Sequence, residues 1–276
     1  TEDYTTLYTQ LKEYHKVNNA TDLHVEDSSL SNSNVKIEVK DGKLNLYAEG
    51  KFYNNFIEFV RYKDAGDTYN YSPDLKDNGE VADIKSASVI LDGKLRAAIK
   101  VETSFFPVII YLNKKSKLLN FKIKWHNLLI NKIWKVRFNL PKKVTNVYSE
   151  DLNCLICRKF DPNYNMKEHL PKKKGVETKT NTAPMQRFAW ANGFGIITHG
   201  LQEYEVYQKT LSVTLLRSIG IISNPKNPAR TTPAGPPIEV LTLQQLGENS
   251  VEFYACAGDV TMYGRNIDNI FPQVIF

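Results

Sequence analysis

The segment richest in groups that could do chemistry is the ten-residue stretch Asp64-Ala-Gly-Asp-Thr-Tyr-Asn-Tyr-Ser-Pro73. It places the carboxylates of Asp64 and Asp67 next to the phenol rings of Tyr69 and Tyr71. Carboxylates accept hydrogen bonds from hydroxyl groups, and a tyrosine offers a hydroxyl tip together with an aromatic face that suits the C–H side of a sugar ring. This combination is typical of carbohydrate contact. A capped turn whose tyrosines only pack would have the same composition, so the residues alone leave both interpretations open.

Asp64 and Asp67 could instead be the carboxylate pair of a glycosidase. A retaining glycosidase needs its two carboxyl groups about 5 Å apart on opposite sides of the scissile bond. Two aspartates on one short loop more often lie on the same side, where they cap the turn or bind a cation. We therefore do not interpret Asp64 and Asp67 as a catalytic pair.

The sequence indicates no other catalytic, phosphate-binding or metal site. No G-x-S-x-G, H-E-x-x-H or phosphate-binding glycine motif is present. Cys154 and Cys157 form a C-x-x-C pair, but no second ligand pair stands at a spacing that would complete a zinc site. We expect reduced, packed thiols, no metal ligands and no cofactor in this chain.

Charge and hydropathy exclude several classes of protein. Of the 276 residues, 36 are Lys or Arg and 30 are Asp or Glu, which gives a formal net charge of +6. The basic residues are dispersed, unlike the concentrated basic face of a nucleic-acid-binding protein. The apolar runs are too short to cross a bilayer. No secretory signal is recognisable and the cysteine count is odd, so we expect a cytoplasmic protein without nucleic-acid or membrane partners.

The elements that must position the candidate loop are β-strands. Residues 35–39 and 43–47 alternate apolar and polar around Asp41-Gly42, and residues 87–91 and 95–101 repeat the design around Asp92-Gly93. Further strand-like segments recur along the chain, almost without helical periodicity. The pattern predicts an all-β protein with a large antiparallel sandwich.

Two stretches of the chain lack the strand pattern. Residues 161–184 are polar and contain three prolines, and residues 223–237 contain five. Such proline density prevents regular structure, so both stretches are predicted to be long surface loops. We interpret residues 1–33 as an N-terminal segment at the end of a preceding domain and residues 34–276 as the sandwich, part of a longer protein.

Several segments together resemble the C-terminal β region of glycoside hydrolase family 38, the α-mannosidase family, and its bacterial branch in particular. The resemblance covers roughly residues 30–258 and runs in the order of the family. It rests on the following segments: the entry at 30–42; the G-D-x-Y loop within 64–73; the strand pair from Trp125 to Phe138; the G-L-x-E-Y-E signature at 200–205; the T-L-L-R-S strand at 214–218; and Arg230, Gly235-Pro236 and Gln244-Gln-Leu-Gly247. Lys132 and Lys135 depart from the His and Arg expected there.

The resemblance implies a fold for this chain and a separate catalytic domain. The fold would be a supersandwich of the galactose-mutarotase-like type, packed on an N-terminal α/β catalytic domain of the same chain. Full-length members resemble zinc-dependent retaining α-mannosidases, whose zinc and catalytic Asp lie in that other domain. This chain would then be a non-catalytic part, inactive alone, of an enzyme that acts on α-mannosides.

The resemblance also implies site residues. Tyr69 would hydrogen-bond substrate near the scissile sugar. Asp67 on the same loop and Arg230 on the Pro-rich loop are the other predicted substrate-binding residues. Glu203, Tyr204, Glu205 and Arg217 are expected to hold strands together, since charged residues borne on strands are often structural ion pairs.

Two other functions stay open at this point. One is a stand-alone carbohydrate-binding or mutarotase-like module, because one fold hosts many functions. A mutarotase needs a His and a Glu as acid and base, and His126 and His199 are the candidates on strands. The other is a purely structural sandwich. A face normally covered by a missing domain could also make the chain a homo-oligomer.

Overall fold

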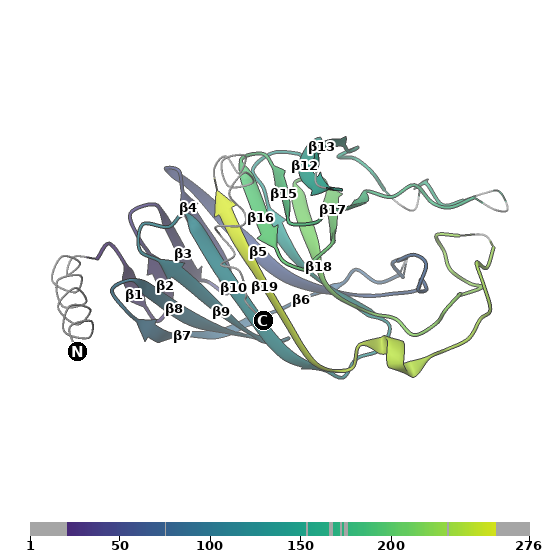
Figure 1. Cartoon of the computed structure of the whole chain (residues 1–276), viewed down its shortest axis with the longest axis horizontal. Coiled ribbons are helices and arrows are strands. Elements are labelled where there is room, and N and C mark those ends of the chain that lie inside the picture. The colour runs from purple at the N-terminus through teal and green to yellow at the C-terminus, as the bar shows by residue number, and fades with distance from the viewer. Residues whose placement is uncertain are drawn as a thin grey trace, which may run out of the picture.

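The computed structural model describes residues 21–257 except 75, 153, 166, 167, 172, 174, 175 and 231. The described chain is almost entirely β, and its strands form two antiparallel sheets (Figure 1). The predicted all-β class and antiparallel sandwich are thus confirmed. No described helix is long and apolar enough to span a membrane.

The first sheet has ten strands and carries the candidate loop. Nine of them lie side by side in this order: β1 (His24–Glu26), β2 (Ser29–Ser31), β3 (Val35–Lys40), β4 (Lys43–Ala48), β5 (Lys51–Lys63), β11 (Lys132–Asn139), β18 (Thr210–Ser218), β17 (Glu203–Tyr207) and β14 (Thr182–Pro184). The tenth, β6 (Glu80–Val81), pairs with the end of β5.

The second sheet has nine strands and lies against the first. In spatial order they are β13 (Cys154–Lys159), β12 (Asn146–Asp151), β15 (Phe188–Ala191), β16 (Phe194–Thr198), β19 (Gly247–Ala257), β10 (Leu118–Asn127), β9 (Pro107–Asn113), β8 (Arg96–Thr103) and β7 (Ile84–Asp92). The longest pairing, β10 with β19, joins ten residue pairs, so segments more than a hundred residues apart in sequence form the centre of this sheet.

The predicted hairpins are present. β3 and β4 are joined at Asp41 and Gly42, whose φ angles of 51° and 68° are both positive. Positive φ angles at both central residues are characteristic of a type I′ turn, whose twist matches that of the flanking strands. Asp-Gly is one of the sequences that readily adopts this turn. β7 and β8 form the second predicted hairpin.

β1 and β2 extend the first sheet beyond the predicted start of the sandwich. Leu30 on β2 pairs with Ile37 on β3, and both are fully buried. The sandwich therefore begins at residue 24 and includes the last ten residues of the predicted N-terminal segment 1–33. Residues 1–20 and 258–276 lie outside the described chain.

Aromatic side chains from both sheets join them at the core. Phe56 of β5 contacts Phe194 of β16 edge to face, with ring centroids 4.8 Å apart, and Phe138 of β11 lies 4.7 Å from the same ring. Phe121 of β10 stacks on Phe253 of β19 at 4.9 Å. Phe138 also lies 6.3 Å from Phe253, so this buried cluster joins the two sheets through both area and geometry.

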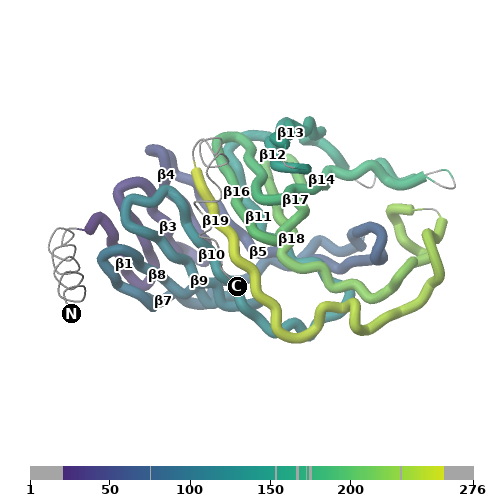
Figure 2. Tube along the Cα trace, viewed as in Figure 1, coloured from purple at the N-terminus to yellow at the C-terminus, as the bar shows by residue number. Residues whose placement is uncertain are grey.

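Three long loops leave the sandwich at one end, away from β1 (Figure 2). They are the tyrosine loop (residues 64–73) after β5, the long loop (residues 161–181) before β14, and the Pro-rich loop (residues 223–237) after β18. The described residues of the Pro-rich loop form no helix or strand, as predicted; a short 3-10 helix, η2 (Leu241–Gln244), follows it.

The aromatic contact between the sheets can be tested on one strand. Phe56→Ala should lower the free energy of unfolding by about 3–5 kcal/mol, because it opens a cavity between the sheets. The matched control is Phe52→Ala on the same strand, whose ring is 53% exposed while that of Phe56 is 0% exposed; it should cost less than about 1 kcal/mol. Urea denaturation measures both. Equal losses would contradict this account of the core.

Candidate functional site

The tyrosine loop is a compact finger closed by its own backbone. Asp64 and Pro73 form an isolated β-bridge, and the amide of Ala65 donates to the carbonyl of Ser72 at 2.8 Å. Gly66 is needed here because a Cβ at that position would lie 2.3 Å from the carbonyl oxygen of Asn70. The sequence thus folds locally into a tight projection with its tyrosines near the tip.

Arg217 at the end of β18 anchors the base of this finger. Its Nε donates to the carboxylate of Asp64 at 2.6 Å, and the Asp64 side chain is fully buried. The same guanidinium also donates to the carbonyls of Asp67 and Asn70, at 2.5 and 3.0 Å. A single arginine therefore fixes both the start and the turn of the loop, and the planar fork of its donors suits that task.

Asp67 joins the tyrosine loop to the Pro-rich loop. Its fully buried carboxylate is ion-paired with Arg230 and accepts from the backbone amides of Asn224 at 2.9 Å and Tyr69 at 3.1 Å. Burial by itself would raise the pKa of Asp67, but hydrogen bonds, the largest from the Asn224 amide, together with the Arg230 charge outweigh it, and the pKa is lowered. Asp67 is therefore ionised in the folded protein.

The Tyr69 side chain stands clear of this buried network and is 57% exposed. The Arg230 guanidinium lies 5.5 Å from the centre of its ring, within range of a cation–π contact. On another side, a Cβ added at Gly235 would lie 3.1 Å from the Tyr69 hydroxyl. The loop pair thus presents an accessible phenol and limits where it can point.

The structure brings the three predicted substrate-binding residues together from two distant segments. Only Tyr69 is accessible; Asp67 and Arg230 are buried and pair with each other. Asp64 and Asp67 are each paired with a different arginine, which agrees with the interpretation that they do not form a glycosidase pair. The contacts of Asp67 and Arg230 are those of residues that position Tyr69.

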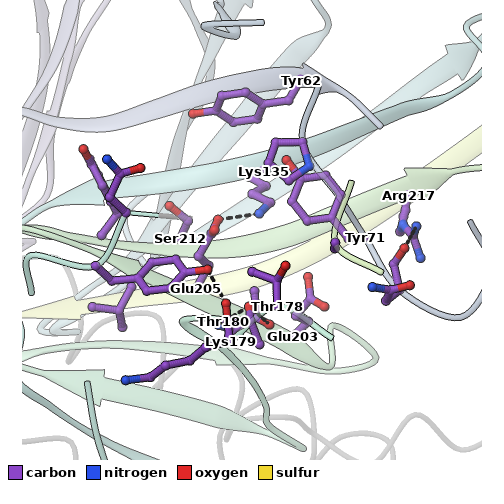
Figure 3. A pocket seen from close by; sticks show the side chains of 18 of the residues that line it. Tyr62, Tyr71, Lys135, Thr178, Lys179, Thr180, Glu203, Glu205, Ser212 and Arg217 are labelled. Carbon is purple, nitrogen blue, oxygen red and sulfur yellow. Dashed lines mark hydrogen bonds and ion pairs between the residues drawn. The ribbon is translucent and has the colours of Figure 1, made fainter. Parts of the chain in front are cut away.

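A cleft of about 500 Å³ opens beside Tyr69, over the outer face of the first sheet (Figure 3). All three loops contribute to its wall. The long loop and the Pro-rich loop are joined by a bridge between Glu177 and Arg230, and the amide of Thr178 donates to the carbonyl of Ala229 at 2.8 Å. The cleft therefore depends on the same loop contacts that hold Tyr69.

A buried cation forms part of the floor of the cleft. Lys135 of β11 is 2% exposed, and its ammonium group is 2.5 Å from the carboxylate of Glu205 on β17, the pair joined by a dashed line in Figure 3. Burial would lower the pKa of Lys135, but Glu205 outweighs it and the pKa is raised. The same ammonium lies 4.7 Å from the centre of the Tyr71 ring. Nothing in the sequence marks Lys135 as a site residue, because a lone lysine on a strand gives no sign of burial.

The residues of the G-L-x-E-Y-E signature lie partly in the core and partly in the cleft. Tyr204 is fully buried between the sheets, while Glu203 and Glu205 face the cleft. Glu205 pairs with Lys135, and Arg217 pairs with Asp64. The predicted structural ion pairs are therefore present, although Arg217 anchors a loop and not a neighbouring strand.

The cysteines and the other metal-binding residue types do not gather into a site. Cys154 and Cys157 are both exposed and unpaired, so the expectation that they pack was wrong; they lie on β13, the edge strand of the second sheet. Within the described chain, no three His, Cys, Asp or Glu side chains converge as a metal would need. The residues that the structure describes therefore do not fit a zinc ion.

Comparison with known proteins identifies the family of this fold. Residues 30–221 match the family model described as the C-terminal domain of the glycosyl hydrolases of family 38. The chain belongs to glycosyl hydrolase family 38, as a C-terminal domain. This family 38 domain includes the tyrosine loop, Lys135 and Arg217, while Arg230 follows the matched region. No curated protein sequence matches the chain.

Two solved structures share the fold of this family 38 domain. An alpha-mannosidase from Enterococcus faecalis V583 superposes with a TM-score of 0.71 at 16% identity, over 91% of this chain and 32% of that one. A family 38 protein from Enterococcus faecalis also gives a TM-score of 0.71, at 14% identity, over 88% of this chain and 32% of that one. The chain thus spans about a third of the length of either protein.

The Asp67–Arg230 pair can be tested by measuring the stability of wild type and variant as a function of pH. Asp67→Asn should cost about 3–5 kcal/mol near pH 7, because it leaves the Arg230 charge buried without its partner. Since the pKa of Asp67 is lowered on folding, its contribution is complete above the unfolded value of about 3.9 and is lost as the pH falls through the lower folded value. The difference between wild type and variant should therefore shrink below about pH 4.

Thermal denaturation across a series of pH values measures this effect. The control is Asp83→Asn, at an exposed aspartate between β6 and β7, which should change stability by less than about 0.5 kcal/mol at any pH. A loss at Asp67 that is no larger than at Asp83, or that does not diminish in acid, would contradict the pairing.

Proposed function

We propose that this family 38 domain is the non-catalytic C-terminal β domain of a zinc-dependent retaining α-mannosidase, and that it lends a substrate-contacting loop to a catalytic domain. The observation that carries the proposal is the family match over residues 30–221, which contains the tyrosine loop. The fold shared with an alpha-mannosidase three times as long supports a catalytic domain elsewhere in the protein. Zinc and the catalytic carboxylates would belong to that domain.

In this proposal Tyr69 is the residue that contacts the α-mannoside. Its hydroxyl makes no hydrogen bond to any described residue, and its ring is in cation–π range of Arg230. The phenol is therefore free to donate to a sugar oxygen without losing a contact within the domain. Asp67 and Arg230 act through Tyr69 by fixing the loops on which it stands.

The same end of the molecule has a surface suited to the catalytic domain. We define the apolar patch by seven exposed side chains on the β10–β11 turn and around η2: Leu128, Leu129, Ile130, Ile238, Leu241, Leu243 and Leu246. Exposed apolar side chains gathered in this way mark interaction surfaces.

Hydrogen bonds fix the two parts of the patch to each other and to the tyrosine loop. The amide of Asn131 donates to Gln244 Oε1 at 2.9 Å, and Gln244 Nε2 donates to Asn131 Oδ1 at 2.7 Å. The carbonyl of Asn131 accepts from the amide of Asp64, also at 2.9 Å. A catalytic domain that packs on the patch would therefore meet the tyrosine loop as well.

A mutarotase-like module is the alternative, and the position of the histidines bears on it. His126 Nδ1 lies 2.9 Å from Glu248 Oε1, which is a suitable distance for an acid–base couple. Both side chains are exposed on paired strands of the second sheet, and neither lines the cleft. A sugar could not be enclosed there, so the family 38 role is the better supported function.

Tyr69 can be tested in the longer enzyme that contains this domain. Tyr69→Phe should lower kcat/KM on an aryl α-mannoside about two- to tenfold, the equivalent of one lost hydrogen bond, with an unchanged melting temperature. The matched control is Tyr47→Phe, whose hydroxyl donates to Glu38 at 2.9 Å on β3, outside the cleft; it should leave the kinetics unchanged. Equal kinetics for Tyr69→Phe and wild type would remove Tyr69 from the site.

The apolar patch can be tested by charge substitution. Leu128→Asp together with Leu241→Asp should weaken association between this domain and the separately expressed catalytic domain by about tenfold or more, because the aspartates would be buried without partners. Leu155→Asp on β13, an exposed leucine outside the patch, is the control. Calorimetry measures the association. If the Leu155 variant were as weak as the double variant, the patch would not be the docking surface.

A further inference from the structure

The cleft beside Tyr69 has the size and closure of a ligand site. Its volume of about 500 Å³ falls within the range of about 300–1,000 Å³ that is usual for small-molecule pockets. Strands β11, β17 and β18 form its floor and the three loops form its wall, so parts of the domain far apart in sequence enclose it. The proposed function uses only Tyr69 at its rim and leaves the floor without a role.

The charges that line the cleft balance. Among the described residues, the cationic side chains are Lys135, Arg137, Lys179 and Arg217. The anionic ones are Asp77, Glu177, Glu203 and Glu205. With four of each sign, the lining has no excess of positive charge to concentrate a phosphate, a nucleotide or an acidic sugar. An uncharged ligand fits this balance.

The acceptors of the cleft suit a ligand rich in hydroxyl groups. Glu203 Oε1 accepts from the Thr214 hydroxyl at 2.7 Å, and Glu205 Oε2 is paired with Lys135. In the described chain the other oxygen of each carboxylate has no partner. The two glutamates are two residues apart on β17 and so face the same side of the sheet. They offer a pair of side-chain acceptors to neighbouring hydroxyls.

The aromatic side chains of the cleft suit the apolar faces of sugar rings. Five tyrosines line it, and Tyr207 on β17 is 51% exposed next to the two glutamates. Tyr71 is a further hydroxyl donor, because burial raises its pKa well above the usual value and keeps it protonated. Its hydroxyl makes no hydrogen bond within the part of the chain that the structure describes.

We propose that this cleft is a binding site for a neutral oligosaccharide. Glu203 and Glu205 accept hydrogens from sugar hydroxyls, Tyr207 packs against the face of a ring, and the Lys135–Glu205 pair holds one acceptor in place. Tyr69 at the rim joins the cleft to the site of the proposed function. If that function holds, the ligand is the part of the α-mannoside that lies beyond the scissile sugar.

The binding of a linear α-linked mannotriose to this chain, measured by calorimetry, tests the proposal. Mannotriose should bind with an affinity that does not change between low and high salt, because the ligand is neutral. Tyr207→Ala should weaken binding about two- to tenfold through the lost ring contact. Glu203→Gln, which keeps the shape and the acceptor for Thr214, should weaken it by a similar factor.

The control is Tyr47→Ala, an exposed tyrosine of the same sheet that does not line the cleft, and it should bind like wild type. Inorganic phosphate serves as the anionic probe and should not compete. Absence of mannotriose binding at millimolar concentration, competition by phosphate, or equal affinities for all variants would each overturn the proposal. The kinetic test of Tyr69 is unaffected by these outcomes, so the two ideas fail separately.

Discussion

Two carboxylate–guanidinium pairs, each with a fully buried carboxylate, determine the form of the functional end of this domain. Asp64 with Arg217 fixes the base of the tyrosine loop, and Asp67 with Arg230 fixes its tip to the Pro-rich loop. Each pair is costly to desolvate and is stable only because backbone groups satisfy its remaining donors and acceptors. Such pairs specify one arrangement of loops more than they add stability, which suits a surface that must present Tyr69 in a defined place.

The strand pleat explains how one sheet serves as both core and cleft floor. On β17, Tyr204 points between the sheets while its neighbours Glu203 and Glu205 point outward. The same alternation on β11 places Phe138 in the core and Arg137 in the cleft. A shift of register by one residue would bury the charges and expose the aromatic rings, so packing of the core also secures the chemistry outside it.

The sequence was informative where local chemistry decides the structure. Asp41-Gly42 and the alternation on either side predicted the first hairpin, and the proline density of residues 223–237 predicted a loop. The grouping of Tyr69 with Arg230 came only from the family resemblance, since no local signal joins positions so far apart. Burial of Lys135, exposure of Cys154 and the inclusion of β1 in the sheet depend on tertiary contacts, which single-residue propensities do not contain.

The separation of the paired residues along the chain has a consequence for how the domain is made. Arg217 is 153 residues from Asp64, and Arg230 is 163 residues from Asp67. During synthesis, both aspartates leave the ribosome long before their partners exist, and water must hydrate them until β18 and the Pro-rich loop arrive. Contacts of such high sequence separation form slowly. The tyrosine loop therefore cannot take its final form until β18 and the Pro-rich loop have been made, much later than the local hairpin of β3 and β4.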